Sequence, residues 1–132
     1  MARFLTTFQS TVPPWECDMV EHFTVAFYYQ KLDYATAIAL QAAGIDPADP
    51  SSPRMVRCLT RFVRELVKGD IYRIETAQLG ADRLGHRLIN AETGSASTHF
   101  LQFFSAPLPD LPASGTAKGE WEELEQKPRE PL

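Results

Sequence analysis

Cysteine is scarce in this chain, so no disulfide framework can hold the fold together. The 132 residues include two cysteines, Cys17 and Cys58, which could form at most one disulfide bond. The opening residues Met-Ala-Arg-Phe-Leu lack the apolar run of a secretory signal peptide. We therefore expect a cytoplasmic protein with reduced thiols, whose stability comes from a hydrophobic core.

Long apolar runs and an excess of positive charge are also missing. No stretch approaches the roughly 20 apolar residues that would span a bilayer, so the sequence predicts no membrane segment. The 13 Lys and Arg residues are outnumbered by 17 Asp and Glu residues, which gives a formal net charge of -4. Because nucleic-acid-binding domains usually display a basic face, we expect neither a nucleic acid nor a membrane as a partner.

Apolar residues are plentiful enough for one core. They make up 44% of the chain, and aromatic residues make up 11%. A chain of this length supplies one such core rather than two. We place the domain at residues 1–105 and assign residues 106–132, which are rich in proline and charge, to a C-terminal tail. That tail is expected to be either flexible or a short helix docked through Trp121.

One long helix is predicted between Thr24 and Ala43. Apolar side chains recur there at three- and four-residue steps, and polar residues fall between them. Thr24 is a competent N-cap, and Gly44 followed by Pro47 is typical of a helix end. These signals indicate an amphipathic helix of about five turns.

Extended segments lie on both sides of this helix in the sequence. Their β-branched and aromatic residues predict strands at 3–12, 56–66, 70–79, 83–91 and 97–104. Short turns between the last four strands predict an antiparallel meander. A helix wrapped by a curved five-stranded antiparallel sheet is the economical packing, so we expect an α+β fold.

The junction between the first strand and the helix holds the residues best suited to chemistry. Backbone N–H groups at the start of a helix lack partners within it and can polarise a carbonyl oxygen. Asp18, held near such donors, could act as a base toward water or as a nucleophile toward an acyl group. Residue type alone favours a simpler role, in which Asp18 caps a turn and His22 is an ordinary structural imidazole.

A resemblance to a known family bears on that choice. The chain resembles the 4-hydroxybenzoyl-CoA thioesterase-like branch of the hot-dog superfamily in the segment Asp18-Met19-Val20-Glu21-His22-Phe23-Thr24, then in Tyr28 and Tyr29, and then in Asp33-Tyr34-Ala35. Two later turns are similar as well, Arg64-Glu65-Leu66-Val67-Lys68-Gly69-Asp70 and Ala91-Glu92-Thr93-Gly94. The resemblance covers residues 3 to about 105 and implies a hot-dog fold.

The resemblance implies an acyl-CoA thioesterase that releases a free acid and CoA without a cofactor. The site would lie between two subunits of a dimer or tetramer. Asp18 would be the catalytic carboxylate with His22 and Thr24 as supports, and the helix amides would face the thioester carbonyl. We assign substrate binding to Glu21, Phe23, Tyr28 and Tyr29, and CoA phosphate binding to Arg57 or Arg61, which share a strand face. One tyrosine of the pair would pack in the core, and a solvated or subunit-contact face is at least as well supported for the arginines.

The chain departs from the family pattern at two positions. The Gly that precedes His in the family is Glu21 here, and the Asn two residues after His is Thr24. A large side chain where the backbone turns tightly, together with the loss of a carboxamide, could abolish or redirect the activity. A non-catalytic acyl or acyl-CoA binding module on the same scaffold is therefore the contrasting hypothesis.

Two other kinds of site are less well supported. Cys17 with His22 could indicate a cysteine hydrolase, but no third orienting group is evident. The histidines His22, His86 and His99 match no familiar ligand spacing of a metal site and fall on separate elements. We therefore predict neither a metal nor a cofactor.

Overall fold

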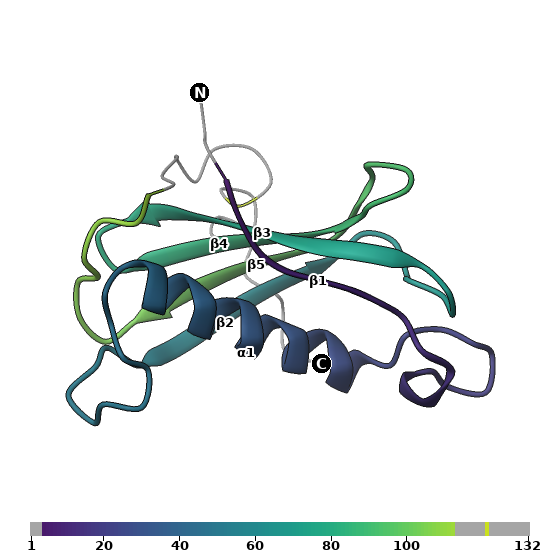
Figure 1. Ribbon diagram of the computed structural model, residues 1–132, viewed down its shortest axis with the longest axis horizontal. Helices are drawn as coiled ribbons and strands as arrows, with labels where there is room; N and C mark the ends of the chain where they lie inside the picture. The colour runs from purple at the N-terminus through teal and green to yellow at the C-terminus, as the bar shows by residue number, and fades with distance from the viewer. Residues whose placement is uncertain (1–3, 113–120, 122–132) are drawn as a thin grey trace.

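The structure, a computed structural model, describes residues 4–112 and Trp121, which contain one five-stranded antiparallel sheet and one long helix. The strands are β1 (Leu5–Thr11), β2 (Met55–Phe62), β3 (Ile71–Gly80), β4 (Arg83–Asn90) and β5 (Ala96–Phe104). Between β1 and β2 lie a short 3-10 helix, η1 (Pro14–Glu16), and the long helix α1 (Val25–Ala42). Figure 1 shows α1 lying lengthwise along one side of the curved sheet, with the loop that precedes it at one end.

Helix α1 begins and ends close to the predicted positions. Thr24 is the N-cap and has extended backbone, although its hydroxyl makes no capping hydrogen bond. Gly44 follows the helix with a φ of 84°, a conformation that glycine adopts without steric cost. Ala35 and Ala39 are fully buried, so α1 lies close against the sheet. In the described part of the chain, no helix has the length and apolarity needed to cross a membrane.

The strand order is β1-β3-β4-β5-β2, so the predicted meander is wrong for β2. Strands β3, β4 and β5 pair in succession, but β2 pairs with β5 at the far edge of the sheet rather than with β3. Strand β2 ends at Phe62, four residues before the predicted end at Leu66. The connection 63–70 then passes the ends of β5 and β4, about 14 Å across three strand spacings, which eight residues span easily.

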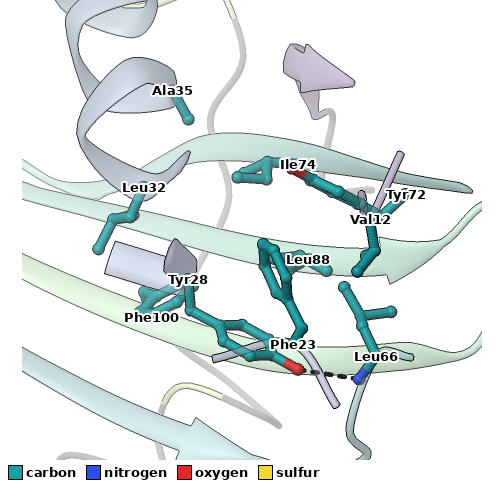
Figure 2. Close-up of a cluster of buried hydrophobic side chains, with 10 residues drawn as sticks. All are labelled: Val12, Phe23, Tyr28, Leu32, Ala35, Leu66, Tyr72, Ile74, Leu88 and Phe100. Carbon is teal, nitrogen blue, oxygen red and sulfur yellow. Dashed lines mark hydrogen bonds between the residues drawn. The ribbon is translucent and has the colours of Figure 1, made fainter. Parts of the chain in front are cut away.

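The main core lies between α1 and the sheet, toward the N-terminal end of the helix. Figure 2 shows its ten buried side chains, which are Val12, Phe23, Tyr28, Leu32, Ala35, Leu66, Tyr72, Ile74, Leu88 and Phe100. A second cluster near the other end of α1 includes Leu108 and Leu111. The packed core therefore extends past residue 105, where the sequence predicted the domain to end.

Trp121 lies against the sheet face opposite to α1. Its side chain is 2% exposed, and its Nε1–H donates to the carbonyl of Phe100 at 3.1 Å. The indole ring stacks on Phe4 and meets the His99 ring edge to face. A Cβ atom at Gly85 would overlap the Leu79 side chain and lie 3.0 Å from the indole, so this glycine leaves space that Leu79 and Trp121 fill. The position of Trp121 agrees with a docked tail; the rest of the tail, residues 113–120 and 122–132, lies outside the described residues.

A row of polar side chains crosses the inner face of the sheet beneath α1. The Thr7 hydroxyl lies 2.9 Å from that of Thr76, which lies 2.7 Å from Nδ1 of His86. His86 Nε2 lies 2.6 Å from Oε1 of Gln102, whose Nε2 donates to the Thr36 hydroxyl at 2.9 Å. Because Oε1 of an amide only accepts, we assign the imidazole proton to Nε2. Burial lowers the pKa of His86 to about 4, so this imidazole is neutral in the folded protein at pH 7.

Candidate active site

The loop between η1 and α1 folds back on itself. The N–H of Asp18 donates to the carbonyl of His22 at 2.9 Å, and Cys17 forms an isolated bridge with Phe23. The N–H of Thr24 donates to the carbonyl of Glu16 at 3.0 Å, which joins η1 to the start of α1. These bonds hold the backbone around Asp18 against the segment that leads into the helix.

Asp18 caps this turn. Its Oδ1 accepts the backbone N–H groups of Val20 and His22, each at 3.0 Å, and its side chain is exposed. This is the capping role that residue type alone favoured. The same two bonds hold the carboxylate in one position on the surface, which a base or a nucleophile also requires.

Glu21 has an unusual backbone conformation. Among the described residues it is the non-glycine residue with a positive φ, 63°. This is the position at which the family pattern has glycine, the residue that adopts a left-handed backbone without steric cost. The carboxylate pairs with Lys68 at 2.8 Å, and the Lys68 N–H donates to the Glu21 carbonyl at 3.0 Å. The hydrogen bond that Lys68 Nζ donates to the Glu21 carboxylate raises the pKa of Lys68, and both side chains are exposed.

Replacing Glu21 with glycine should therefore stabilise the fold. Relief of the left-handed strain is worth about 1 kcal/mol, and the lost exposed ion pair is worth less. Glu21→Ala is the matched control, because it removes the ion pair and keeps the Cβ atom. We expect the free energy of unfolding, measured by urea denaturation, to be about 1 kcal/mol higher for Glu21→Gly than for Glu21→Ala. Equal values for the two variants would show that the backbone at this position is not strained.

His22 links the loop to the connection between β2 and β3. Its Nδ1 lies 2.6 Å from Oε2 of Glu65, and its backbone pairs with Val67. The described contact of the imidazole is thus with Glu65, and its link to Asp18 runs through the backbone. The support of Asp18 by the His22 side chain stays a prediction. The imidazole remains about two-fifths exposed to solvent.

Phe23 and Tyr28 belong to the hydrophobic core rather than to an open binding surface. They are 3% and 2% exposed, and their rings meet edge to face. The Tyr28 hydroxyl accepts the N–H of Leu66 at 2.8 Å, as Figure 2 shows. Burial raises the pKa of this phenol. Phe23 and Tyr28, both predicted as substrate contacts, therefore support the site from within the core and expose little surface to a substrate.

Tyr29 is the tyrosine of the pair that faces outward. It is 38% exposed, its hydroxyl lies 2.8 Å from that of Thr60, and its ring meets the 39% exposed ring of Phe62 edge to face. Asp33 lies one helical turn further along α1. Burial, and to a lesser extent the Asp33 charge, raise the pKa of Cys58 on β2, so this carboxylate also lies toward β2. Phe62 was missed at the sequence level because it reads as one more apolar strand residue.

Arg57 and Arg61 lie away from this surface. On β2 they are paired with Phe103 and His99 of β5. The Arg57 guanidinium lies 5.4 Å from the Phe103 ring, and Arg83 approaches the same ring at 4.9 Å. The two arginines share a face, as predicted, but it is the face opposite to α1 by strand alternation, so they are not brought together with Asp18.

A shallow surface cavity of about 160 Å³ lies next to the Glu65 end of the connection. It is lined by Arg64, Glu65, Leu66, Asn90, Thr93, Ser95, Ala96 and Ser97. None of the predicted site residues is among them. Glu65 connects it to the loop through His22.

The two alternative sites were a cysteine hydrolase and a metal site. Cys17 Sγ donates to the carbonyl of Pro13 at 3.5 Å, and lost solvation together with neighbouring carboxylates raises the pKa of this thiol. A raised pKa disfavours a thiolate nucleophile. His86 and His99 lie on opposite faces of the sheet, and His22 lies in the loop. Across residues 4–112 and Trp121, no group of three or more His, Cys, Asp or Glu side chains is placed to hold a metal ion.

Comparison with known proteins gives one curated relative and many similar folds. Betainyl-CoA thioesterase from Pseudomonas aeruginosa is 29% identical over 128 residues, which covers 91% of this chain and 80% of the relative. The predicted enzyme class, thioester hydrolase, is the class of this relative and is thereby supported. No family model matches the chain.

Three solved structures have the same architecture. A candidate thioesterase from Pseudomonas putida has a TM-score of 0.68 and 23% identity, and the match covers 98% of this chain and 92% of that one. A 1,4-dihydroxy-2-naphthoyl-CoA thioesterase from Synechocystis has a TM-score of 0.63 and 12% identity, covering 96% and 98%. A Staphylococcus aureus protein solved in complex with CoA has a TM-score of 0.69 and 15% identity, covering 80% and 77%. These matches confirm the predicted fold.

Proposed function

The chain is a hot-dog protein that resembles acyl-CoA thioesterases, and we propose that it hydrolyses a small acyl-CoA to a free acid and CoA. The observation that carries the proposal is the Asp18 carboxylate, which two backbone N–H groups hold in the loop that leads into the 18-residue helix α1. A fixed carboxylate next to unpaired helix amides is a suitable pair for attack on a thioester carbonyl. The fold and the curated relative support the same activity.

The chemistry assigned to each group follows from its position. The first helical hydrogen bond runs from the N–H of Phe27 to the carbonyl of Thr24, so the amides of Val25 and Ala26 precede it and can face a carbonyl oxygen. Asp18 would remove a proton from water as the water attacks the carbonyl carbon. The C–S bond then breaks, and CoA leaves as a thiol after taking up the proton. In the covalent alternative, the Asp18 carboxylate attacks the carbonyl carbon, the C–S bond breaks and CoA leaves as a thiolate that takes up a proton from water; water then hydrolyses the mixed anhydride to the free acid and Asp18.

A second copy of the chain is part of the proposal. Exposed apolar side chains surround the loop and follow the edge strand β2; they are Trp15, Met19, Val20, Val25, Val56, Phe62, Val63 and Val67. Apolar surface of this extent next to an edge strand is typical of a subunit contact. We propose a dimer or tetramer with the acyl-CoA bound between two subunits. The proposed location is cytoplasmic, in keeping with two free thiols.

The acyl group is the finer part of the proposal. Betainyl, the acyl group in the relative's name, carries a quaternary ammonium ion. The partly exposed rings of Tyr29 and Phe62 are suited to bind such a cation, and Asp33 adds a negative charge one turn away. Tyr29 lies about 6 Å along the helix axis from Val25. An ammonium group close to a thioester carbonyl at the helix start would reach this aromatic surface.

A panel of acyl-CoAs tests both parts of the proposal. Purified protein would be given short, branched, aromatic and betainyl-CoA thioesters while free thiol is measured. We expect hydrolysis of betainyl-CoA at a kcat/KM about 5-fold above that of 3,3-dimethylbutyryl-CoA, its neutral isostere, since a cation–aromatic contact contributes about 1 kcal/mol. Equal kcat/KM values for these two would reject the cationic preference and leave thioesterase activity intact.

The contrasting function, a non-catalytic acyl-CoA binding module, is favoured by Glu21 and Thr24. Glu21 occupies the strained position where the family has glycine, and the Thr24 hydroxyl makes no capping bond. For a binding module, calorimetry would detect binding of an acyl-CoA while no member of the panel releases thiol. That pair of results would replace the proposed activity with binding alone.

A further inference from the structure

A buried ion pair lies directly behind the loop that holds Asp18. Nζ of Lys31 is 2.9 Å from Oε2 of Glu16, and the two residues are 7% and 8% exposed. Glu16 ends η1, two residues before Asp18, and Lys31 lies in the second turn of α1. Charged residues are seldom buried to this extent, so the pair calls for an explanation.

The surroundings of this pair are mostly apolar. Lys31 Nζ lies 5.9 Å from the ring centre of Phe27 and 5.6 Å from that of Tyr34, and it also donates to Oε1 of Gln30. On the other side, the buried Oε1 of Glu16 has no hydrogen-bond partner in the described structure. The carboxylate is therefore only half satisfied in a poorly hydrated place.

Stability alone does not account for such a pair. Removing two charges from water costs several kcal/mol per ion, and an apolar pair of similar size is often as stable or more stable. The unpartnered oxygen of Glu16 adds to that cost. The pair is better explained by a geometric role, in which it fixes one element against another.

Glu16 contacts α1 through both its backbone and its side chain. Its backbone carbonyl accepts the N–H of Thr24 at the N-cap, and its side chain reaches Lys31 further along the helix. Asp18 follows after one residue and is tied to His22 by its own backbone. The position of the carboxylate relative to the first helix amides thus depends on where Glu16 is held.

We propose that Glu16 and Lys31 are positioning residues that set the distance between the Asp18 carboxylate and the N-terminal amides of α1. The inference rests on the proposed function for its kinetic consequence. Neither residue touches the thioester. Both act through the loop and the helix start, where a displacement of about 1 Å can change a rate by 10²-fold.

The double variant Glu16→Met/Lys31→Met separates positioning from stability. It removes both charges and keeps similar volumes, so the free energy of unfolding should equal or exceed that of the wild type. We expect kcat to fall at least 10-fold with KM changed less than about 3-fold. Lys31→Arg, which can keep the pair, should retain at least about a third of the wild-type kcat. Glu75→Gln is the matched control, because it breaks an ion pair with Arg73 and Arg87 on the sheet.

A stably folded double variant with wild-type kcat would overturn the positioning role. So would a Glu75→Gln variant that loses as much activity as the double variant, because the effect would then be general. Hydrogen exchange gives a readout that does not need activity: the amides of residues 18–26 should exchange faster in the double variant. If the wild type proves inactive on every acyl-CoA, the proposed function fails, and unchanged exchange at these amides would still reject the positioning role separately.

Discussion

Asp18→Asn should lower kcat/KM for acyl-CoA hydrolysis by about 10²- to 10⁴-fold while leaving the fold almost as stable as before. Asparagine keeps an oxygen that can accept the N–H groups of Val20 and His22, so the turn stays capped. It loses the negative charge that a base or nucleophile needs, and a well-placed catalytic base contributes about 10²- to 10⁴-fold. The substitution therefore separates the two roles that Asp18 has in this loop.

Asp18→Ala is the companion variant for this test. It removes the charge and the cap together, so it should lose about 1 kcal/mol of stability in addition to the rate. Free thiol release and urea denaturation, measured on both variants and the wild type, give the two readouts. An Asp18→Asn variant that hydrolyses acyl-CoA at the wild-type rate would leave Asp18 a turn cap and nothing more.

His86 should make the protein lose about 3 kcal/mol of stability as the pH falls from 6.5 to 4. Its pKa is about 4 in the folded protein, below the ordinary value of 6.5. Between those two values the unfolded chain binds a proton that the folded chain does not, so stability falls with falling pH by about 1.4 kcal/mol per unit. The contribution is complete above pH 6.5, and below pH 4 this imidazole adds no further loss.

The variant His86→Gln isolates this contribution. It removes the titrating group and retains a side chain that can both donate and accept beside Thr76 and Gln102. The arginines beside Glu75 hold the pKa of that carboxyl below its usual range despite partial burial, so its own loss occurs below about pH 4.5. The window from pH 4.5 to 6.5 therefore reports His86. The free energy of unfolding would be measured by urea denaturation at several pH values and fixed protein concentration. Its slope against pH should be smaller in the variant than in the wild type by about 1.4 kcal/mol per pH unit, which corresponds to one proton. An unchanged slope would contradict the assignment.

Most of the fold follows from local patterns in the sequence. The helix was predicted from 24 to 43 and spans Val25–Ala42, because periodicity, cap and terminal glycine all act locally. The strands were found for the same reason. The place of β2 was not, since its pairing with β5 depends on contacts between residues some 40 positions apart along the chain. The turn residues around Gly69 suggested a hairpin, but they belong to the longer connection between β2 and β3.

The candidate site was predicted less completely than the fold. Asp18 and the helix start were located because a carboxylate before a helix is visible in one short segment. The partner of His22 was not, because Glu65 comes from a distant part of the chain. Glu16 and Lys31 were also missed. Their residue types are the same whether they lie on the surface or in a buried ion pair, and only the tertiary packing distinguishes the two cases.

The strand order also bears on how the protein is made. Both edge strands, β1 and β2, come from the first half of the chain, and the three central strands come from the second half. While the ribosome is still translating the second half, α1 and both edge strands exist without the strands they pair with or pack on. Such a topology delays productive pairing and leaves apolar segments exposed until β5 has emerged. The yield of folded protein in a cell should therefore depend on how nascent chains are protected as well as on the stability of the finished fold.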